Sequence, residues 1–205
     1  MLFRGLKRGF DFISALLLFI VLTPLFLVLM VLVRTMLGSP IFFTQVRSGM
    51  NQKPFKLIKF RSMTNAADEN GKLLPDEQRQ TKFGGFLRSS SLDELPELLC
   101  IIKGDMSVIG PRPLPPTYDS YYTEREKKRF EVRGGLLPPE VLNNNVQPTW
   151  DEQLEYEATY AEKLSLKTDV LIIISVFKGL MKRYKNDYGE YVRYSLIDER
   201  SKVIK

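Results

Sequence analysis

Phe12-Ile-Ser-Ala-Leu-Leu-Leu-Phe-Ile-Val-Leu-Thr-Pro-Leu-Phe-Leu-Val-Leu-Met-Val-Leu-Val33 decides how the chain is built, because it has no charge and only Ser14 and Thr23 as polar residues. As a helix rising about 1.5 Å per residue it is about 30 Å long, enough to cross the hydrocarbon core of a bilayer. It is long for the apolar region of a signal peptide, and Arg34-Thr-Met-Leu lacks the small residues of a cleavage site. The run predicts a membrane anchor, with a cleaved signal peptide as the alternative.

Pro24 lies near the centre of this run, where it removes one backbone hydrogen bond from a helix. The hydroxyl of Thr23 can donate to a freed carbonyl, as in kinked membrane helices. Basic residues flank both ends, and between Asp11 and Asp68 every charged residue is basic. Because positive charge favours the cytoplasmic side, both ends are expected on that face. A helix that bends at Thr23 and Pro24 and returns satisfies this; a kinked helix that spans once is the alternative.

The composition excludes several kinds of chemistry. The 205 residues include no histidine and one cysteine, Cys100. Ser-His-Asp and Cys-His nucleophiles, His-ligated zinc and imidazole acid–base catalysis are therefore excluded, as is an intrachain disulfide. Any chemistry must use carboxylates, Lys, Arg, Tyr or hydroxyl groups. The net charge of +6 and the acid-free basic block indicate an anionic partner, either nucleic acid or a membrane face with phosphorylated ligands.

Beyond the anchor, the pattern predicts an α+β fold that is mostly helical with a small β-hairpin. Residues 40–46 and 54–61 have the composition of two short strands, with turn residues between them. Helices are expected in three segments: 83–103 with a break near Pro96, 118–132, and 150–164. A surface loop or short helices are expected at 65–82, an ordered loop at 104–116, and another irregular segment at 134–150.

Near the C-terminus, the apolar residues 170–177 lead into clustered Lys and Arg at 178–185. This pattern favours an amphipathic helix that lies on the membrane surface. A core helix with a solvated end is the alternative. Residues from Tyr184 onward are expected to form a loosely held tail.

Ser91-Leu-Asp-Glu94 carries the most informative acidic pair. Its spacing is that of a capping box, in which Ser91 and Glu94 satisfy the first backbone N–H groups of a helix. The helix can also begin at Pro96, and in either register Asp93 and Glu94 lie at a helix N-terminus, where anions are favoured. A carboxylate can attack phosphorus to form an acyl phosphate, and two carboxylates suit Mg²⁺. The tetrad is therefore a helix cap or a phosphoryl-transfer site.

Four basic residues are candidates for binding a substrate phosphate. Arg112 lies between two prolines, which fix the backbone and present the guanidinium for bidentate binding. Lys59 and Arg61 are expected to share one face of the strand at 54–61, and Arg88 lies just before the acidic tetrad. The alternatives are a rigid turn with a solvated arginine and a solvated strand face. The sequence contains no Gly-rich phosphate loop or dinucleotide fingerprint.

Taken together, these residues resemble the bacterial sugar transferase family, the monotopic phosphoglycosyl transferases. The motifs that carry the resemblance are Lys59-Phe-Arg-Ser-Met63, Ser91-Leu-Asp-Glu-Leu-Pro96 and Lys103-Gly-Asp-Met-Ser-Val-Ile-Gly-Pro-Arg-Pro113. The similarity runs from about Leu6 to Pro113 and resumes weakly from Leu164 to Arg183. It implies transfer of a sugar-1-phosphate from a UDP-sugar to a polyprenol (undecaprenyl) phosphate, the first membrane step of glycan biosynthesis.

The resemblance also implies roles for single residues. Asp93 is the implied nucleophile, which forms a covalent phospho-sugar and releases UMP. Glu94 is its partner in binding Mg²⁺ or handling protons, and Arg112 contacts phosphate. Asp169 falls where members often carry an Asp, with no mechanism attached.

The same resemblance implies an organisation and a location. It predicts a re-entrant membrane-anchoring helix at 1–35, broken at Thr23 and Pro24, a catalytic domain on the cytosolic face at 36–183, and a C-terminal tail at 184–205. The location is the cytoplasmic face of the bacterial inner membrane. The partners are the UDP-sugar, undecaprenyl phosphate and membrane lipids, with no nucleic acid expected.

One segment departs from the family pattern. Members usually carry Arg-Pro-Gly-Ile-Thr-Gly followed by Gln-Val and a Gly-Arg pair, whereas this chain has a different sequence from Val132 to Trp150. Arg133 and a glycine remain, and the later arginine does not. The candidates for contact with the nucleotide or sugar are Arg133, Asn143, Asn144 and Asn145. The sequence leaves the donor sugar, the pathway and the oligomeric state open.

Two other functions stay open. The basic block fits a membrane-anchored, non-catalytic binder of RNA or anionic lipid, although clustered aromatic residues for base stacking are lacking. A polyprenyl-phosphate hydrolase is the third possibility.

Overall fold

The computed structural model describes residues 2–143, 148–183 and 195–203 of the chain. The chain folds into two compact units. We call residues 7–45 and 56–104 the anchor unit, and residues 1–6, 46–55 and 105–205 the C-terminal unit. Each unit is described by itself. The domain boundaries expected at residues 35 and 183 stay predictions.

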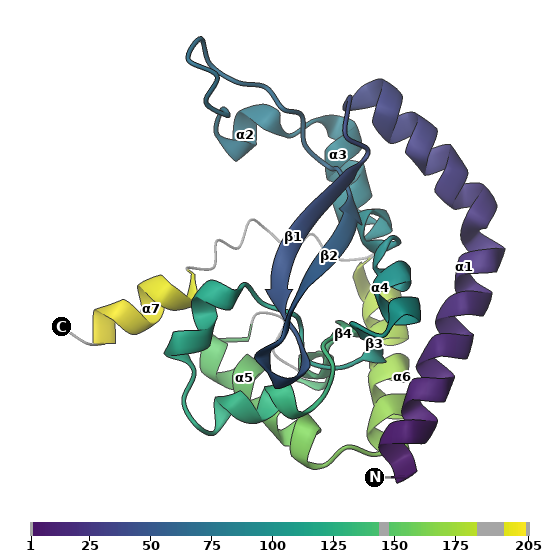
Figure 1. Ribbon diagram of the computed structural model, residues 1–205, viewed down its shortest axis with the longest axis vertical. Coiled ribbons are helices and arrows are strands. Elements are labelled where there is room, and N and C mark those ends of the chain that lie inside the picture. The colour runs from purple at the N-terminus through teal and green to yellow at the C-terminus, as the bar shows by residue number, and fades with distance from the viewer. Residues whose placement is uncertain (1, 144–147, 184–194, 204–205) are drawn as a thin grey trace. The chain divides into compact units, whose positions relative to one another are not determined.

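Helix α1 (Leu2–Met36) runs without interruption through Pro24 and curves along its length (Figure 1). The hydroxyl of Thr23 donates to the carbonyl of Phe19 at 2.8 Å. This acceptor lies one residue before Ile20, whose carbonyl Pro24 leaves without its helical donor. The structure therefore does not show the expected helix–break–helix, and the re-entrant path stays a prediction.

Most of α1 is exposed and apolar. The helix is long and apolar enough to cross a membrane, and only 17% of its most apolar window is buried against the protein. Val21, next to the centre of the helix, is 72% exposed. Because exposed apolar surface of this size is costly in water, α1 indicates association with a membrane.

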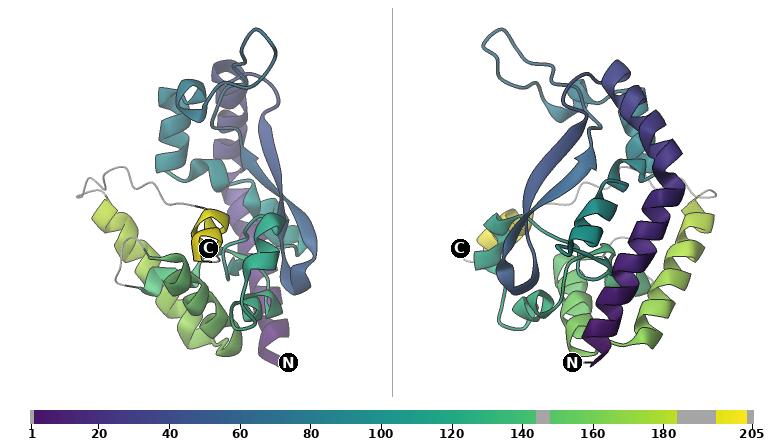
Figure 2. Two further views of the ribbon diagram at one scale, coloured as in Figure 1. Left: turned by 90° about the vertical axis from the view of Figure 1, so that its left-hand side faces the viewer. Right: turned by 45° about the vertical axis from the view of Figure 1, so that its right-hand side comes forward.

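The remaining face of α1 forms the core of the anchor unit. The helix runs beside α3 and α4 (Figure 2), and its buried stripe packs on a strand and a helix of the same unit. The rings of Phe26 and Phe60 lie 4.8 Å apart between centroids. The cluster comprises Phe26, Leu29, Val33, Leu37, Phe60 and Leu87.

The predicted β-hairpin is confirmed. Strands β1 (Phe42–Ser48) and β2 (Pro54–Phe60) pair in a two-stranded sheet. The turn contains the short 3₁₀ helix η1 (Met50–Gln52). It closes where the N–H of Gly49 donates to the carbonyl of Lys53 at 2.9 Å.

The predicted helical region with a break near Pro96 is also confirmed, in three pieces. They are α3 (Lys82–Ser89), the 3₁₀ helix η2 (Leu92–Glu94) and α4 (Glu97–Lys103). The segment before them is mostly loop with the short helix α2 (Asp76–Arg79), as expected. Gly104, at φ 99°, ends α4 in the left-handed conformation that glycine adopts without strain.

The C-terminal unit is built from a small parallel sheet and several helices. Strands β3 (Ser107–Ile109) and β4 (Gly135–Leu137) pair with Ser107 opposite Gly135 and Ile109 opposite Leu137. The helices, with η marking 3₁₀ segments, are η3 (Pro116–Tyr121), η4 (Glu126–Glu131), η5 (Pro139–Leu142), α5 (Trp150–Glu162), α6 (Leu166–Arg183) and α7 (Leu196–Val203). Helix α5 confirms the helix expected at 150–164.

Two expectations about this unit are wrong. The loops expected at 104–116 and 134–150 contain β3 and β4, whose 3 residues each are too few to show a strand pattern. The single helix expected at 118–132 is two 3₁₀ segments, separated at the extended Tyr122. There, Thr123 and Glu126 each accept a hydrogen bond from the other's backbone N–H, which starts a new turn.

The expected loose tail is corrected over residues 196–203, which form α7. Leu196 is fully buried in a cluster with Trp150 and Leu154. Arg200 forms ion pairs of 2.6 Å with both Glu126 and Asp151. These contacts hold the helix against the C-terminal unit.

Candidate active site

The acidic tetrad forms a turn and not a capping box. Ser91 adopts a left-handed conformation, with φ 56° and ψ 18°, and its side chain makes no cap hydrogen bond. The carboxylate of Glu94 instead accepts a hydrogen bond from Lys59 Nζ at 2.6 Å. Helix α4 begins directly after Pro96, as the second register predicts. The capping-box alternative is therefore wrong, because Glu94 is directed to a cation on another element.

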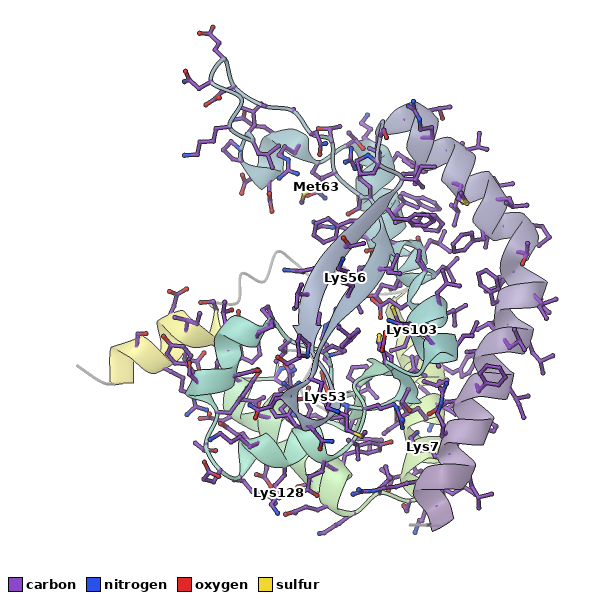
Figure 3. All side chains as sticks on the ribbon, viewed as in Figure 1. Lys7, Lys53, Lys56, Met63, Lys103 and Lys128 are labelled. Atoms are coloured by element: carbon purple, nitrogen blue, oxygen red, sulfur yellow. The ribbon has the colours of Figure 1, made fainter. Side chains whose placement is uncertain are left out.

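Lys59 lies between two glutamates. Its Nζ is 2.6 Å from Glu94 Oε1 and 3.2 Å from Glu97 Oε1. Lys59 comes from β2 and Glu97 from the first turn of α4; Figure 3 labels Lys56 and Lys103 on these two elements. Sequence reasoning missed Glu97, although its spacing of three residues from Glu94 places both on one side of a helical turn. Lys59 is thus engaged by carboxylates of its own unit.

Asp93 is the buried member of the acidic pair, with 8% of its surface exposed. Burial raises the pKa of its carboxyl above the ordinary value, and repulsion from Glu94 adds to this. Attraction to Lys59, and more weakly to Arg88, opposes the rise in the pKa of Asp93. A buried carboxylate with a perturbed pKa beside cations is typical of a functional site.

Three of the four predicted cations lie in the anchor unit, and the structure brings two of these three to Asp93. Lys59 and Arg88 both act on its charge. Arg88, on the exposed side of α3, also donates to the hydroxyl of Ser62 at 3.1 Å.

Arg61 lies just past the end of β2, buried, with its guanidinium 3.5 Å from the carbonyl of Leu37. The expectation that Lys59 and Arg61 line one strand face is wrong, because β2 ends at Phe60.

Arg112 lies in the C-terminal unit, after β3, with an exposed side chain. Its backbone N–H donates to Glu157 Oε1 at 3.1 Å, and its carbonyl accepts from Arg129 at 2.5 Å. The other candidates of this unit are half-buried: Arg133 precedes β4, and Asn143 follows η5. Asn144 and Asn145 lie outside the described residues.

Asp169 has a structural partner. It is buried at the start of α6 and accepts a hydrogen bond from the hydroxyl of Tyr160 at 2.7 Å. The same hydroxyl lies 3.2 Å from the carbonyl of Ile109. Asp169 and Tyr160 therefore link α5 and α6 to the end of β3, just before the Arg112 loop.

Binding of Mg²⁺ would depend on the oxygen ligands that the anchor unit offers. Among the described residues, no group of three or more acidic, His or Cys side chains is arranged to hold a metal. Mg²⁺ commonly takes only one or two carboxylates and completes its shell with water and substrate phosphates. The repulsion between Asp93 and Glu94 that raises the pKa of Asp93 is what a cation would relieve. Binding of Mg²⁺ by Asp93 and Glu94 stays a prediction.

The chain matches a known protein family. The family model described as bacterial sugar transferase matches residues 2–183 of the sequence. An uncharacterized sugar transferase of Bacillus subtilis, EpsL, is 42% identical over 168 residues, which cover 82% of this chain and 83% of EpsL. ExoY, an exopolysaccharide production protein of Sinorhizobium fredii, is 33% identical over 191 residues, covering 85% of this chain and 84% of ExoY.

A relative with a fully stated activity is longer than this chain. The UDP-glucose:undecaprenyl-phosphate glucose-1-phosphate transferase of Klebsiella pneumoniae is 35% identical over 189 residues. The alignment covers 86% of this chain and 40% of that protein.

A long apolar helix, in the same unit as the buried Asp93 and the ion pair of Lys59 with Glu94, indicates a membrane-associated protein with an acidic site. The family match over residues 2–183 completes the identification. The chain belongs to the bacterial sugar transferase family, and the resemblance drawn from its motifs is confirmed.

Proposed function

We propose that the protein transfers a sugar-1-phosphate from a UDP-sugar to undecaprenyl phosphate, at the cytoplasmic face of the bacterial inner membrane, in polysaccharide biosynthesis. The observation that carries this proposal is the buried Asp93 beside Lys59 and Glu94 in a member of this family. The names of relatives support the substrates. One transfers glucose-1-phosphate from UDP-glucose, and an Aeromonas hydrophila relative is named for UDP-N-acetylgalactosamine. These names differ in the sugar, so the proposal covers UDP-sugars as a class.

The chemistry consists of two displacements at one phosphorus atom. The Asp93 carboxylate attacks the phosphorus attached to the sugar, and the bond between that phosphorus and the UMP oxygen breaks. UMP leaves with the bonding electrons, and the phospho-sugar stays on Asp93 as an acyl phosphate. An oxygen of undecaprenyl phosphate then attacks the same phosphorus, forms the diphosphate product and frees the carboxylate.

The neighbours of Asp93 handle charge in this scheme. Lys59 and Arg88 attract the Asp93 carboxylate and would also attract the phosphate that meets it. Glu94 and Glu97 hold the Lys59 ammonium in place, at 2.6 and 3.2 Å. Mg²⁺ bound by Asp93 and Glu94 together with substrate phosphates would supply further charge neutralisation.

Contacts on both sides of Pro24 support a re-entrant anchor. Ala15, before Pro24, and Val33, after it, are both buried, at 1% and 0% exposure. Arg8, near the start of α1, donates to the carbonyls of Ile101 and Ile102 at the end of α4, at 2.7 and 2.9 Å. A helix that left the enzyme halfway and crossed the bilayer would carry one of these halves away from the anchor unit.

Helix α6 supports a second contact with the membrane. Among the described side chains of α6, five apolar ones are exposed; Leu166, Val170, Ile174 and Phe177 recur at helical spacing, and Leu171 is the fifth. Ile172, on the opposite side, is fully buried in the C-terminal unit. Exposed Lys167 and Lys178 accompany the apolar stripe. This division of faces is that of a helix lying at a bilayer surface.

The test uses purified full-length protein in lipid nanodiscs, with undecaprenyl phosphate, Mg²⁺ and a panel of UDP-sugars. UMP release and the lipid-linked product are both measured. We expect Asp93→Asn to abolish both, while Asp76→Asn, the same change on an exposed carboxylate of α2, leaves both unchanged. Mass spectrometry of protein treated with donor alone is expected to find the phospho-sugar on Asp93.

Wild-type rates in the Asp93→Asn variant would exclude the nucleophile assignment. Free phosphate or sugar phosphate without a lipid product would identify a hydrolase. Salt-sensitive RNA binding without UMP release would identify a non-catalytic binder.

A further inference from the structure

Both backbone polar groups of Arg112 are held by one buried ion pair. The N–H of Arg112 donates to Glu157 Oε1 at 3.1 Å, and its carbonyl accepts from Arg129 at 2.5 Å. Arg129 and Glu157 themselves pair at 2.7 Å, with side-chain exposures of 2% and 0%. Two residues from distant parts of the chain, on η4 and α5, thus hold the backbone of a single residue on both sides of its Cα.

The remaining bonds of the pair fix its own geometry. Arg129 also donates to the hydroxyl of Tyr122 at 3.0 Å, and its guanidinium lies 5.2 Å from the ring centroids of Tyr122 and Phe130. Gln153 donates to Glu157 Oε1 at 3.0 Å. Each nitrogen of the Arg129 guanidinium therefore has a separate, directed acceptor. A flexible ammonium cannot reproduce this fork.

The opposite side of the Arg112 loop is fixed by close backbone packing. The N–H of Gly135 donates to the carbonyl of Pro111 at 2.9 Å. A Cβ on Gly135 would lie 2.0 Å from the nitrogen of Gly110. The two backbone segments therefore approach more closely than a side chain permits. Pro111 and Pro113 restrict the backbone dihedral angles on both sides of Arg112.

We propose that the Arg129–Glu157 pair is a positioning clamp for Arg112, which holds its peptide so that the exposed guanidinium meets a substrate phosphate at one fixed place. The phosphate-binding role of Arg112 rests on the proposed function. Arg129 and Glu157 are positioning residues in this proposal, because they are buried and act through the Arg112 backbone. The proposal explains why an ion pair is buried here: replacing such pairs with apolar residues often costs no stability, so stability alone does not account for it.

The sequence provides a direct test of the clamp. Pro111 and Pro113 have no N–H, so Arg112 is the one exchangeable backbone amide between Gly110 and Leu114. Hydrogen–deuterium exchange with fragmentation of this peptide therefore reports the bond to Glu157. We expect slow exchange in the wild type and exchange faster by at least about tenfold in Arg129→Lys. Arg125→Lys, the same change at an exposed arginine, is the matched control, with Arg112 exchange unchanged.

Activity tests whether the clamp acts through Arg112. In the UMP assay, Arg129→Lys is expected to lower kcat by about tenfold, because a misplaced Arg112 guanidinium stabilises the transition state less. The same change is expected to have no further effect, within about twofold, when Arg112→Ala is already present. Arg125→Lys is expected to keep kcat and KM near wild-type values.

Three results would overturn the proposal, and each is distinct from failure of the proposed function. Rapid exchange of the Arg112 amide in the wild type would show that no clamp exists, even if Arg129→Lys does not fold. Full additivity of Arg129→Lys and Arg112→Ala would show that Arg129 acts by another route. Wild-type activity of Arg112→Ala would remove the reason for a clamp. Failure of the proposed function would appear as the absence of UMP release by the wild type, and the exchange measurement would still decide on the clamp.

Discussion

At the scale of the residue, Asp93 is a buried carboxyl whose ionisation opposes stability. Its carboxyl is desolvated by folding, so the folded-state pKa lies above the unfolded-state pKa. Below the unfolded-state pKa the group is protonated in both states and costs nothing. As the pH rises past that value, ionisation favours the unfolded chain, so stability falls. Ionisation of Asp93 in the folded protein therefore does not stabilise it.

This predicts that Asp93→Asn raises Tm at pH 7 by about 1–3 °C while activity is lost. The gain is expected to disappear near pH 3, below the ordinary pKa of 3.8, where the wild-type carboxyl is largely protonated in both states. Thermal unfolding of both proteins in detergent at the two pH values measures this. A lower Tm for the variant at pH 7 would contradict the assignment of a destabilising charge.

Glu140 is a second carboxyl whose ionisation is unfavourable. Its Oε2 is buried and, among the described residues, has no hydrogen-bond partner. Burial, with repulsion from Glu157, raises the pKa of Glu140 to about 8, although Arg112 and Arg129 oppose the rise. The folded state thus holds a proton that the unfolded state has already released between about pH 4.5 and 8.

We therefore expect wild-type stability to decline from about pH 4.5 to 8, with a smaller decline in Glu140→Gln. The variant is expected to unfold at the higher temperature at pH 8.5, and the difference is expected to vanish near pH 4.5. Melting curves across this pH range provide the measurement. Glu124→Gln, on an exposed carboxylate, serves as the control. Parallel pH curves for wild type and Glu140→Gln would refute the prediction.

At the scale of the element, the start of α1 caps the end of α4. The guanidinium of Arg8 donates to the carbonyls of Ile101 and Ile102 in the last turn, where helical donors run out; the Ile101 carbonyl also accepts from the N–H of Gly104. Arg8→Met is expected to cost about 1–2 kcal/mol and lower Tm by about 3–6 °C. Arg4→Met, at an exposed position, is expected to shift Tm by less than about 1 °C. Equal shifts in the two variants would show that the cap contributes nothing specific.

Elements with a repeated pattern could be predicted from the sequence, and elements held by distant partners could not. The apolar run of α1, the strands around Gly49 and the break near Pro96 all have local signals. The pairing of Ser107 with Gly135 has none, because neither three-residue strand is long enough to alternate.

The candidate site follows the same division. The motifs indicated Asp93, Glu94 and Lys59, but their spacing did not show that Glu94 turns to Lys59 instead of capping a helix. Arg129 and Glu157 lie in charged segments that resemble solvated helices. Only the fold shows that they are buried against each other.

At the scale of the whole molecule, the proposed path of α1 makes a prediction about sidedness. Single cysteines are introduced at Arg4, before the apolar run, and at Lys53, after it, in a Cys100→Ser background. A re-entrant helix places both on the same side, so a membrane-impermeant thiol reagent labels both from the cytoplasmic face. A third cysteine at Val21, 72% exposed on the protein, is expected to be shielded by lipid. Labelling of the first two positions from opposite sides would establish a helix that spans once.

The stripe of α1 that packs on Phe60 and Leu87 has a practical consequence for anyone who wants a water-soluble form of this enzyme. Trimming the apolar N-terminus would remove Phe26, Leu29 and Val33, and with them much of the interior of the unit that holds Asp93. The apolar side chains left behind would become exposed to water, and the shortened protein would aggregate. Solubility has to come instead from recoding the lipid-facing side of the helix while its inward-facing side is kept intact.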